Sequence, residues 1–230
     1  SGPKKSSGSC YIYLLTPERF LYHTLFLPLG RQWYNPFVDT SVRILKRATL
    51  AFGEFGYDAT SLDDLARALD IRKQSILYHY PSKELLLEAC VRQAIADLSV
   101  ALDEAIRKSS YGWERIESIV KRVFRLANNR PELLGLLREV TRLGPPILTN
   151  AVEGMRPLLD GATVWLIEEM ENGRVRRSDP ELLVLSAYST IMGAATEVKL
   201  FEALGEESTI RHVAMRRKEL LRFLKIALIP

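Results

Sequence analysis

The fold is decided by one stretch of sequence, TSLDDLARALDIRKQSILYHY, at residues 60–80. Apolar residues recur at helical spacing in its two halves, which predicts two short helices at about 61–69 and 72–79. Thr60 or Ser61 is expected to cap the first helix. Asp70 is expected to form the turn, because Asp tolerates the left-handed conformation better than most residues. Two short helices joined by such a turn form the helix-turn-helix pattern, which places its second helix in the major groove of DNA.

The second of these helices begins with polar groups that suit DNA. Cations, an amide and a hydroxyl at a helix N-terminus can meet phosphates and base edges, with Gln suited to adenine and Arg or Lys suited to guanine. Hydroxyls before the first helix, and Lys83 after the second, are expected to contact the phosphates on either side. The predicted DNA-binding residues are Thr60, Ser61, Arg72, Lys73, Gln74, Ser75, Tyr78, His79 and Lys83.

Helical spacing continues in both directions, so the fold class is predicted to be all-α. A helix from Asp39 or Thr40 to Gly56 completes a three-helix head, and Ser82 is expected to cap a long helix that ends near Lys108. Pro157 is expected to kink or interrupt a later helix. Later helices are expected at 113–128, 131–142, 146–171, 180–203 and 209–228.

The first 37 residues have a different character. A polar Gly/Ser/Lys segment (SGPKKSSGS) is followed by an aromatic run at 11–29, which residues 16–19 (TPER) interrupt. No apolar stretch there approaches the roughly 20 residues that a membrane-spanning helix needs. We predict that residues 1–37 are an extension of uncertain origin, added to the regular protein; a partner-binding arm is the alternative.

Composition excludes several classes of protein. The 230 residues are 47% hydrophobic and 26% charged, with a net charge of +4, which is typical of a globular protein. Two cysteines and three dispersed histidines favour neither a disulfide framework nor a metal site. We found no zinc-protease, serine-hydrolase or Walker phosphate-loop motif, and predict no enzyme activity, no metal and no cofactor. A hydrolase with paired carboxylates and a helical protein-binding adaptor remain the alternatives.

The charge of the predicted head argues for local contacts with DNA. Residues 38–88 carry seven basic and eight acidic side chains, so the head has no excess positive charge. Any attraction to DNA must therefore come from the placement of Arg72, Lys73 and Lys83. Since few phosphates are neutralised per subunit, a moderate salt dependence of binding is expected.

Residues 38–98 resemble the TetR (tetracycline-repressor-like) family. The resemblance rests on three runs in the family's order: RILKRA from Arg43, FGEFGYDATSLDDLA from Phe52, and IRKQSILYHYPSKELL from Ile71. The chain departs from the pattern at Leu69 and Asp70, where the family usually has Ala and Gly. It also has Leu77 where the family has a phosphate-contacting Tyr, so Tyr78 is expected to supply that contact.

The resemblance implies a dimeric, ligand-responsive regulator, most often a repressor, that a small molecule releases from a palindromic operator. Its partners would be double-stranded DNA, a hydrophobic effector and a second copy of the chain, in the cytoplasm and without membrane attachment. The implied domains are a helix-turn-helix domain at 38–98, with its motif at 61–80, and an effector-binding and dimerisation domain at 99–230. The long helix from Ser82 would act as the lever between them.

Large apolar side chains of the later helices are candidates for the effector pocket, although plain core is the alternative for each. They are Trp113, Phe124, Met155, Trp165, Tyr188 and Met192, with Arg138 and Glu197 as candidate polar anchors. Small residues on one of the last two helices and an apolar stripe on the other predict a four-helix dimer interface. Its predicted residues are Ser186, Ser189, Gly193, Leu220 and Leu224. The basic residues at 211–225 are expected to face solvent, a second nucleic-acid site being the alternative.

Overall fold

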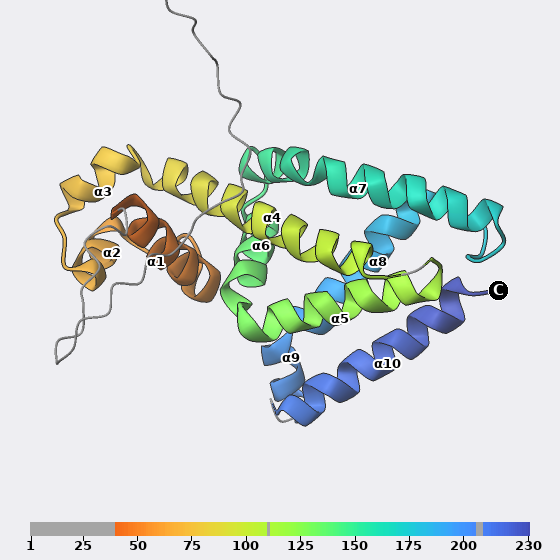
Figure 1. Cartoon of the computed structure of the whole chain (residues 1–230). Helices are drawn as coiled ribbons and strands as arrows, with labels where there is room; N and C mark the ends of the chain where they lie inside the picture. The colour runs from red at the N-terminus through yellow and green to blue at the C-terminus, as the bar shows by residue number, and fades with distance from the viewer. Residues whose placement is uncertain (1–39, 110, 206–208) are drawn as a thin grey trace, which may run out of the picture. The chain divides into compact units, whose positions relative to one another are not determined.

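A computed structural model describes residues 40–109, 111–205 and 209–230 of the chain. The predicted extension at 1–37 lies outside these residues. The described residues are helical and contain no strand, which confirms the all-α fold class (Figure 1). The helices are α1 (Thr40–Phe55), α2 (Leu62–Leu69), α3 (Lys73–His79), α4 (Lys83–Arg107), α5 (Trp113–Asn129), α6 (Pro131–Leu143), α7 (Ile147–Glu171), α8 (Pro180–Thr196), α9 (Val198–Ala203) and α10 (Ile210–Leu228).

The head consists of α1 to α3, and both ends of α2 form as the sequence predicts. The Ser61 hydroxyl accepts a hydrogen bond from the Asp64 backbone N–H at 3.1 Å and so caps α2. Asp70 ends α2 in the left-handed conformation, with φ 54° and ψ 49°. Arg43 of α1 donates to the Leu69 carbonyl at 3.2 Å, which stabilises the last turn of α2. Helix α2 is therefore capped at both of its ends, and Asp70 begins the turn toward α3.

Helix α4 joins the head to the later helices. The Ser82 hydroxyl caps it by accepting from the Leu85 N–H at 3.2 Å. One face of α4 is buried along almost its whole length, from Leu86 to Ala105. The helix passes between α5 and α7, with which it packs (Figure 1). A single helix thus contacts both the head and the interior of the larger helical group.

One prediction about helix continuity is wrong. The helix expected at 180–203 is divided at Glu197, whose ψ of 46° ends α8 before α9 begins. Arg138 of α6 stabilises this break, since its Nη1 donates to the Thr196 carbonyl at 3.5 Å and to Glu197 Oε1 at 3.2 Å. Arg138 and Glu197 therefore bind each other and are not anchors in a pocket. Pro157 lies inside α7, and the helix is not interrupted there.

Helices α1 and α6 cross with their backbones in direct contact. A Cβ atom added at Gly53 would lie well under 3.0 Å from the backbone of Glu132, and one at Gly135 would lie equally close to the Gly53 carbonyl. Only glycine fits at either position. Around this crossing, apolar residues of the head and of the later helices share one core, in which Phe52 and Leu136 are fully buried. The head is therefore held against α6 by close packing.

Candidate nucleic-acid interface and ligand cavity

One edge of α3 is exposed. Ile76 is fully buried and holds the helix on the head, whereas the side chains of Arg72, Gln74 and Tyr78 face solvent. Tyr78 is 84% exposed, and it follows Gln74 by four residues, so the two share one face of α3. Within the described part of the chain, the Arg72 side chain has no ion-pair partner. These three side chains have the exposure and the chemistry needed to reach base edges and phosphates.

The other predicted cations are already engaged within the head. Lys73 Nζ lies 2.8 Å from Asp63 Oδ2, in a pair that links α3 to α2. Lys83 Nζ lies 4.0 Å above the centre of the Tyr57 ring, and the His79 ring packs edge-on against Tyr78. Exposed ion pairs contribute little to stability, so a phosphate could replace Asp63 at small cost. The structure brings these residues together on the side of the head that carries α3.

The predicted phosphate contact by the Thr60 hydroxyl is wrong. Thr60 is only 5% exposed, and its hydroxyl donates to the Gly56 carbonyl at 2.8 Å, inside the loop between α1 and α2. Ser61 is also engaged, since its hydroxyl donates to Asp64 Oδ2 at 2.6 Å. That bond is the main reason that the pKa of Asp64 is lowered. The start of α2 therefore presents carboxylates and a bound hydroxyl.

A polar contact between the head and α6 was not predicted from the sequence. Glu139 Oε1 accepts from the Tyr57 backbone N–H at 2.7 Å. Arg142 lies 2.7 Å from Asp58 Oδ2 and also donates to Glu139. Because 82 residues separate Tyr57 from Glu139, no local pattern could have indicated the contact. We call this set of residues (Tyr57, Asp58, Glu139 and Arg142) the head–body clamp.

Acidification is expected to weaken the head–body clamp. Arg142, and then the Tyr57 N–H, hold the pKa of Glu139 below its ordinary value of 4.5. A carboxylate with a lowered folded-state pKa stabilises the fold above the unfolded-state pKa, and this contribution is lost as the pH falls through the folded-state pKa. Glu139→Gln is therefore expected to cost about 1 kcal/mol at pH 7 and less near pH 3. Urea unfolding at both pH values measures the difference.

The control for this prediction is Glu114→Gln, which changes an exposed carboxylate on α5. It is expected to have little effect at either pH. If the cost of Glu139→Gln were the same at pH 7 and pH 3, the ionised form of Glu139 would not be what stabilises the clamp.

A largely apolar cavity of about 420 Å³ lies among α4, α5, α7, α8 and α10. Four of the six predicted pocket residues line it: Met155, Trp165, Tyr188 and Met192. The prediction is wrong for the other two. Phe124 is 2% exposed and fills the core, and the Trp113 ring packs beneath Lys225, whose Nζ lies 5.6 Å from the ring centre.

Two charged residues that the sequence did not single out also line this cavity. Arg115 comes from α5, and Asp103 comes from α4, where its side chain is exposed. Neither belongs to a motif, so only the fold reveals them. The cavity thus combines apolar walls with a few polar groups, as is usual for small-molecule sites.

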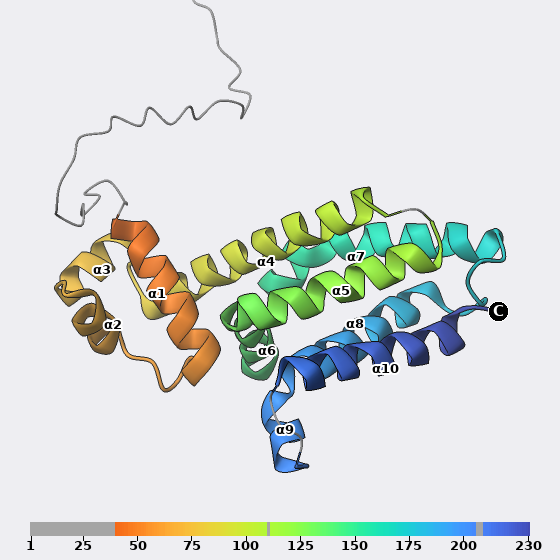
Figure 2. The same cartoon turned by 60° about the horizontal axis from the view of Figure 1, so that its bottom comes forward.

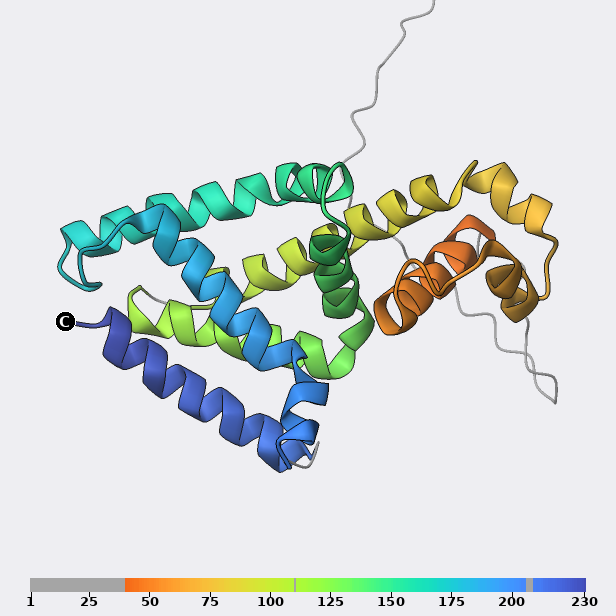
Figure 3. The same cartoon turned by 180° about the vertical axis from the view of Figure 1, so that it is seen from behind.

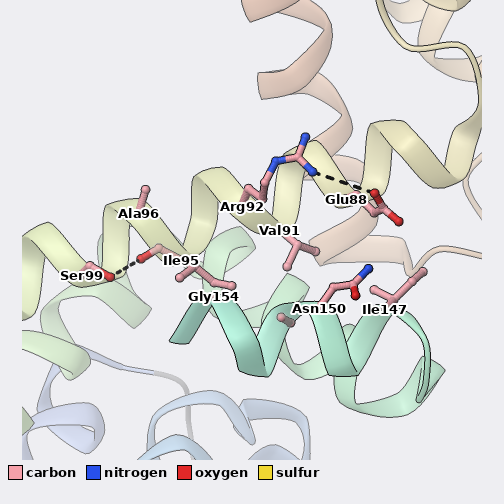
Figure 4. A pocket seen from close by; sticks show the side chains of 10 residues that line it. Glu88, Val91, Arg92, Ile95, Ala96, Ser99, Ile147, Asn150 and Gly154 are labelled. Atoms are coloured by element: carbon pink, nitrogen blue, oxygen red, sulfur yellow. Dashed lines mark hydrogen bonds and ion pairs between the residues drawn. The ribbon is translucent and has the colours of Figure 1, made fainter. Parts of the chain in front are cut away.

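A second hollow of about 490 Å³ lies between α4 and α7 (Figure 4). Its polar side chains are mostly bound along α4 itself. Arg92 pairs with Glu88 at 3.9 Å, and the Ser99 hydroxyl donates to the Ile95 carbonyl at 2.8 Å. Fewer apolar side chains line this hollow than line the cavity among the five helices, which is therefore the stronger candidate for an apolar ligand.

The predicted dimer surface is only partly exposed. Leu220 and Leu224 are 7% and 4% exposed because they pack into the chain's own core, so their assignment to an interface between copies is wrong. Ser186 and Ser189 of α8 are exposed, and Gly193 is half-buried. The exposed large apolar residues of these helices are instead Leu182 and Leu185 on α8, and Ile210, Met215, Phe223 and Ile226 on α10.

The described residues carry no membrane-spanning helix, no metal-binding cluster and no reactive cysteine. None of the helices that the structure describes is long and apolar enough to cross a membrane. Residues 40–109, 111–205 and 209–230 contain no group of three or more His, Cys, Asp or Glu that could hold a metal ion. Cys90 is buried, and burial raises the pKa of its thiol to about 11, which suits packing and not nucleophilic attack.

Comparison with known proteins relates both parts of the chain to regulators. Residues 44–90 match the family described as bacterial regulatory proteins, tetR family. The HTH-type transcriptional regulator RutR of Escherichia coli (strain K12) is 25% identical over 162 residues, which cover 70% of this chain and 76% of RutR.

Solved structures show the same fold over most of the chain. The ketosteroid transcriptional regulator KstR2 of Mycobacterium tuberculosis superposes with a TM-score of 0.68 at 16% identity, covering 84% of this chain and 96% of KstR2. FadR from Bacillus subtilis, solved in complex with stearoyl-CoA, gives a TM-score of 0.67 at 17% identity, covering 79% of this chain and 96% of FadR. The likeness extends well beyond the matched head.

Proposed function

We propose that the chain is a transcriptional regulator of the TetR family, whose model residues 44–90 match, and that it acts as a homodimeric repressor and not as an enzyme. It would act in the cytoplasm on a palindromic operator and be released from it by a small apolar effector. Residues 38–98 would form the DNA-binding domain, and residues 99–230 the effector-binding and dimerisation domain.

The main support for this proposal is the position of helix α4, which connects the head to the cavity. It begins four residues after the end of α3, and its later residues Leu98, Leu102 and Ile106 line the cavity. A ligand that favours one position of α4 would therefore also favour one position of the head. The head–body clamp and the crossing of α1 and α6 offer a second physical link, since α6 packs against both α1 and α4.

The apolar effector is supported by the walls of the cavity, which are mostly aliphatic and aromatic. The stearoyl-CoA in the FadR structure, a ligand with a long apolar chain, is consistent with such walls in this fold. Within our chain, Met155, Trp165, Tyr188 and Met192 are the proposed effector contacts.

The homodimer is supported by α8 and α10, which lie side by side (Figures 2 and 3). Together they expose Leu182, Leu185, Phe223 and Ile226, which a second copy of the same surface would cover. A two-fold dimer through these helices would present two α3 helices to DNA. Half-sites one helical turn apart require a separation of about 34–36 Å.

Removing Arg72 tests the DNA-binding function. Binding sites are first selected from random duplex DNA with the full chain, and affinity for the selected site is then measured by fluorescence anisotropy. Arg72→Ala is expected to lower this affinity about 10- to 100-fold, because a guanidinium bound to guanine contributes about 1–3 kcal/mol. Arg125→Ala, which removes an exposed cation from α5, is the control and should change little.

Two results of this experiment would contradict the proposed function. One is the absence of any enriched duplex sequence in the selection. The other is unchanged affinity of Arg72→Ala for the selected site, which would mean that the exposed edge of α3 does not face the DNA.

A further inference from the structure

We infer that the cavity takes an amphipathic carboxylate: an apolar chain lies against the aliphatic walls, and Arg115 and Trp165 hold the carboxylate. The inference rests on the proposed role of this cavity as the effector site. It goes beyond that role, because it assigns a chemical group to the ligand and names two residues that bind it.

Two buried donors that belong to residues of the cavity wall carry the inference. Within the described part of the chain, Arg115 Nε and Trp165 Nε1 are shielded from solvent and make no hydrogen bond. Both residues line the cavity. Buried polar groups in proteins are nearly always paired, and an unsatisfied one costs about 1–3 kcal/mol. A ligand that brings an acceptor to these donors would recover that free energy.

The two side chains that carry these donors contact each other. The guanidinium carbon of Arg115 lies 5.4 Å from the centre of the Trp165 ring, and 5.4 Å from that of Tyr111. A carboxylate has two oxygens, each able to accept from a different donor, and Arg binds carboxylates in this way more strongly than it binds neutral acceptors. The pair therefore favours an anionic oxygen acceptor.

The other charged groups near Arg115 do not occupy its Nε. Glu169 is buried nearby, but both of its oxygens accept from Arg174, at 2.7 and 2.9 Å. Asp103, the other charged residue of the lining, is exposed on α4. Burial raises the pKa of Tyr188, so its hydroxyl stays neutral and can itself donate to an anion. The cavity wall thus offers donors from Arg115, Trp165 and Tyr188, and its one carboxylate, Asp103, belongs to an exposed side chain.

Not every unsatisfied donor points to a ligand. Arg47 and Arg216 also have buried nitrogens that lack a partner among the described residues, but neither residue lines the cavity. Of the residues that the structure describes, only Arg115 and Trp165 combine an unsatisfied buried donor with a place in the wall of this cavity. The rest of the wall around them is apolar and includes Leu102, Ile119, Leu158 and Ile191.

The test compares three ligands that share a ten-carbon chain and differ in the head: decanoate, decanol and decylamine. Binding to the full chain is measured by isothermal titration calorimetry, and release of the selected DNA by anisotropy. Decanoate is expected to bind at least about tenfold more tightly than decanol or decylamine, the gain usual for a hydrogen bond to a charged group. It is also expected to release the DNA.

Matched variants test the two residues. Arg115→Met keeps the aliphatic stem and Trp165→Phe keeps an aromatic ring, so each mainly removes donors. Each is expected to weaken decanoate binding about tenfold and to leave decanol binding within about twofold. Arg125→Met, away from the cavity on α5, is the control. If Arg115 had only a structural role, Arg115→Met would weaken the binding of decanoate and of decanol equally. If Arg115→Met does not fold, Trp165→Phe alone provides the test.

The outcomes separate this inference from the proposed function. Equal binding of decanoate and decanol, a preference for decylamine, or no binding of decanoate would overturn the carboxylate assignment. Release of DNA by decanol or decylamine would then still support the proposed function. Decanoate binding that depends on Arg115 and Trp165 but leaves the DNA bound would support the inference and contradict the proposed function.

Discussion

Gly53→Ala is expected to lower the free energy of unfolding by about 3 kcal/mol, because it forces a methyl group into the backbone of α6. The atoms that this methyl group would meet belong to the main chain of Glu132, so no side chain can turn away. Relief requires α1 to move from α6, which would disturb the shared core around Phe52. Gly135→Ala is expected to act in the same way, since it meets the backbone of Gly53.

The control for Gly53→Ala is Gly161→Ala. Gly161 lies inside α7, and a Cβ atom there would have no neighbour within 4 Å. Alanine should then stabilise the helix by about 0.5–1 kcal/mol. Urea unfolding, with circular dichroism as the signal, measures both changes. A cost for Gly53→Ala as small as that of an exposed substitution would show that α1 and α6 are not packed backbone to backbone.

The sequence predicted the head well because its geometry is encoded locally. Ser61 and Ser82 cap their helices by bonds to residues three positions ahead, and Asp70 forms the turn by its own backbone conformation. Such signals depend on neighbours in the chain, so a single sequence is enough to find them. The all-α class and the long α4 follow from helical periodicity in the same way.

The parts that were missed depend on contacts between distant residues. Thr60 is a local exception: it has the right chemistry for a phosphate, but its hydroxyl donates to the carbonyl of Gly56, four residues earlier. Leu220 and Leu224 form an apolar stripe that could serve a core or an interface, and only the packing of α10 shows that it serves the core. Arg115 is an ordinary surface residue by sequence, and becomes a candidate ligand-binding residue because the fold places it beside Trp165 in the cavity wall.

Arg174→Met is expected to destabilise the chain by about 2–3 kcal/mol, because it leaves the buried carboxylate of Glu169 without its main partner. Glu169 is fully buried, and Arg174 binds both of its oxygens. Removing one member of a buried ion pair typically costs about 3–5 kcal/mol. The expected value is smaller because the Arg174 side chain is 44% exposed and because Arg115 adds a second positive charge near Glu169.

The pH dependence of this loss identifies its cause. In the parent chain Arg174 lowers the pKa of Glu169, so the stability that this carboxylate contributes is lost as the pH falls. In Arg174→Met, burial without the guanidinium should raise that pKa, so that protonation relieves the buried charge. The difference between parent and variant should therefore shrink between pH 7 and pH 4, measured by urea unfolding.

The double variant Glu169→Gln/Arg174→Met separates charge from packing. A neutral amide needs no cation, so the double variant should be more stable than Arg174→Met alone and nearly independent of pH over the same range. If the double variant were instead as unstable as Arg174→Met at pH 7, the loss would come from the packing of the Arg174 stem. In that case the Glu169–Arg174 ion pair would not be what allows the Glu169 carboxylate to be buried near Arg115. The unpaired Nε of Arg115 would then need an explanation that does not depend on Arg174 occupying Glu169.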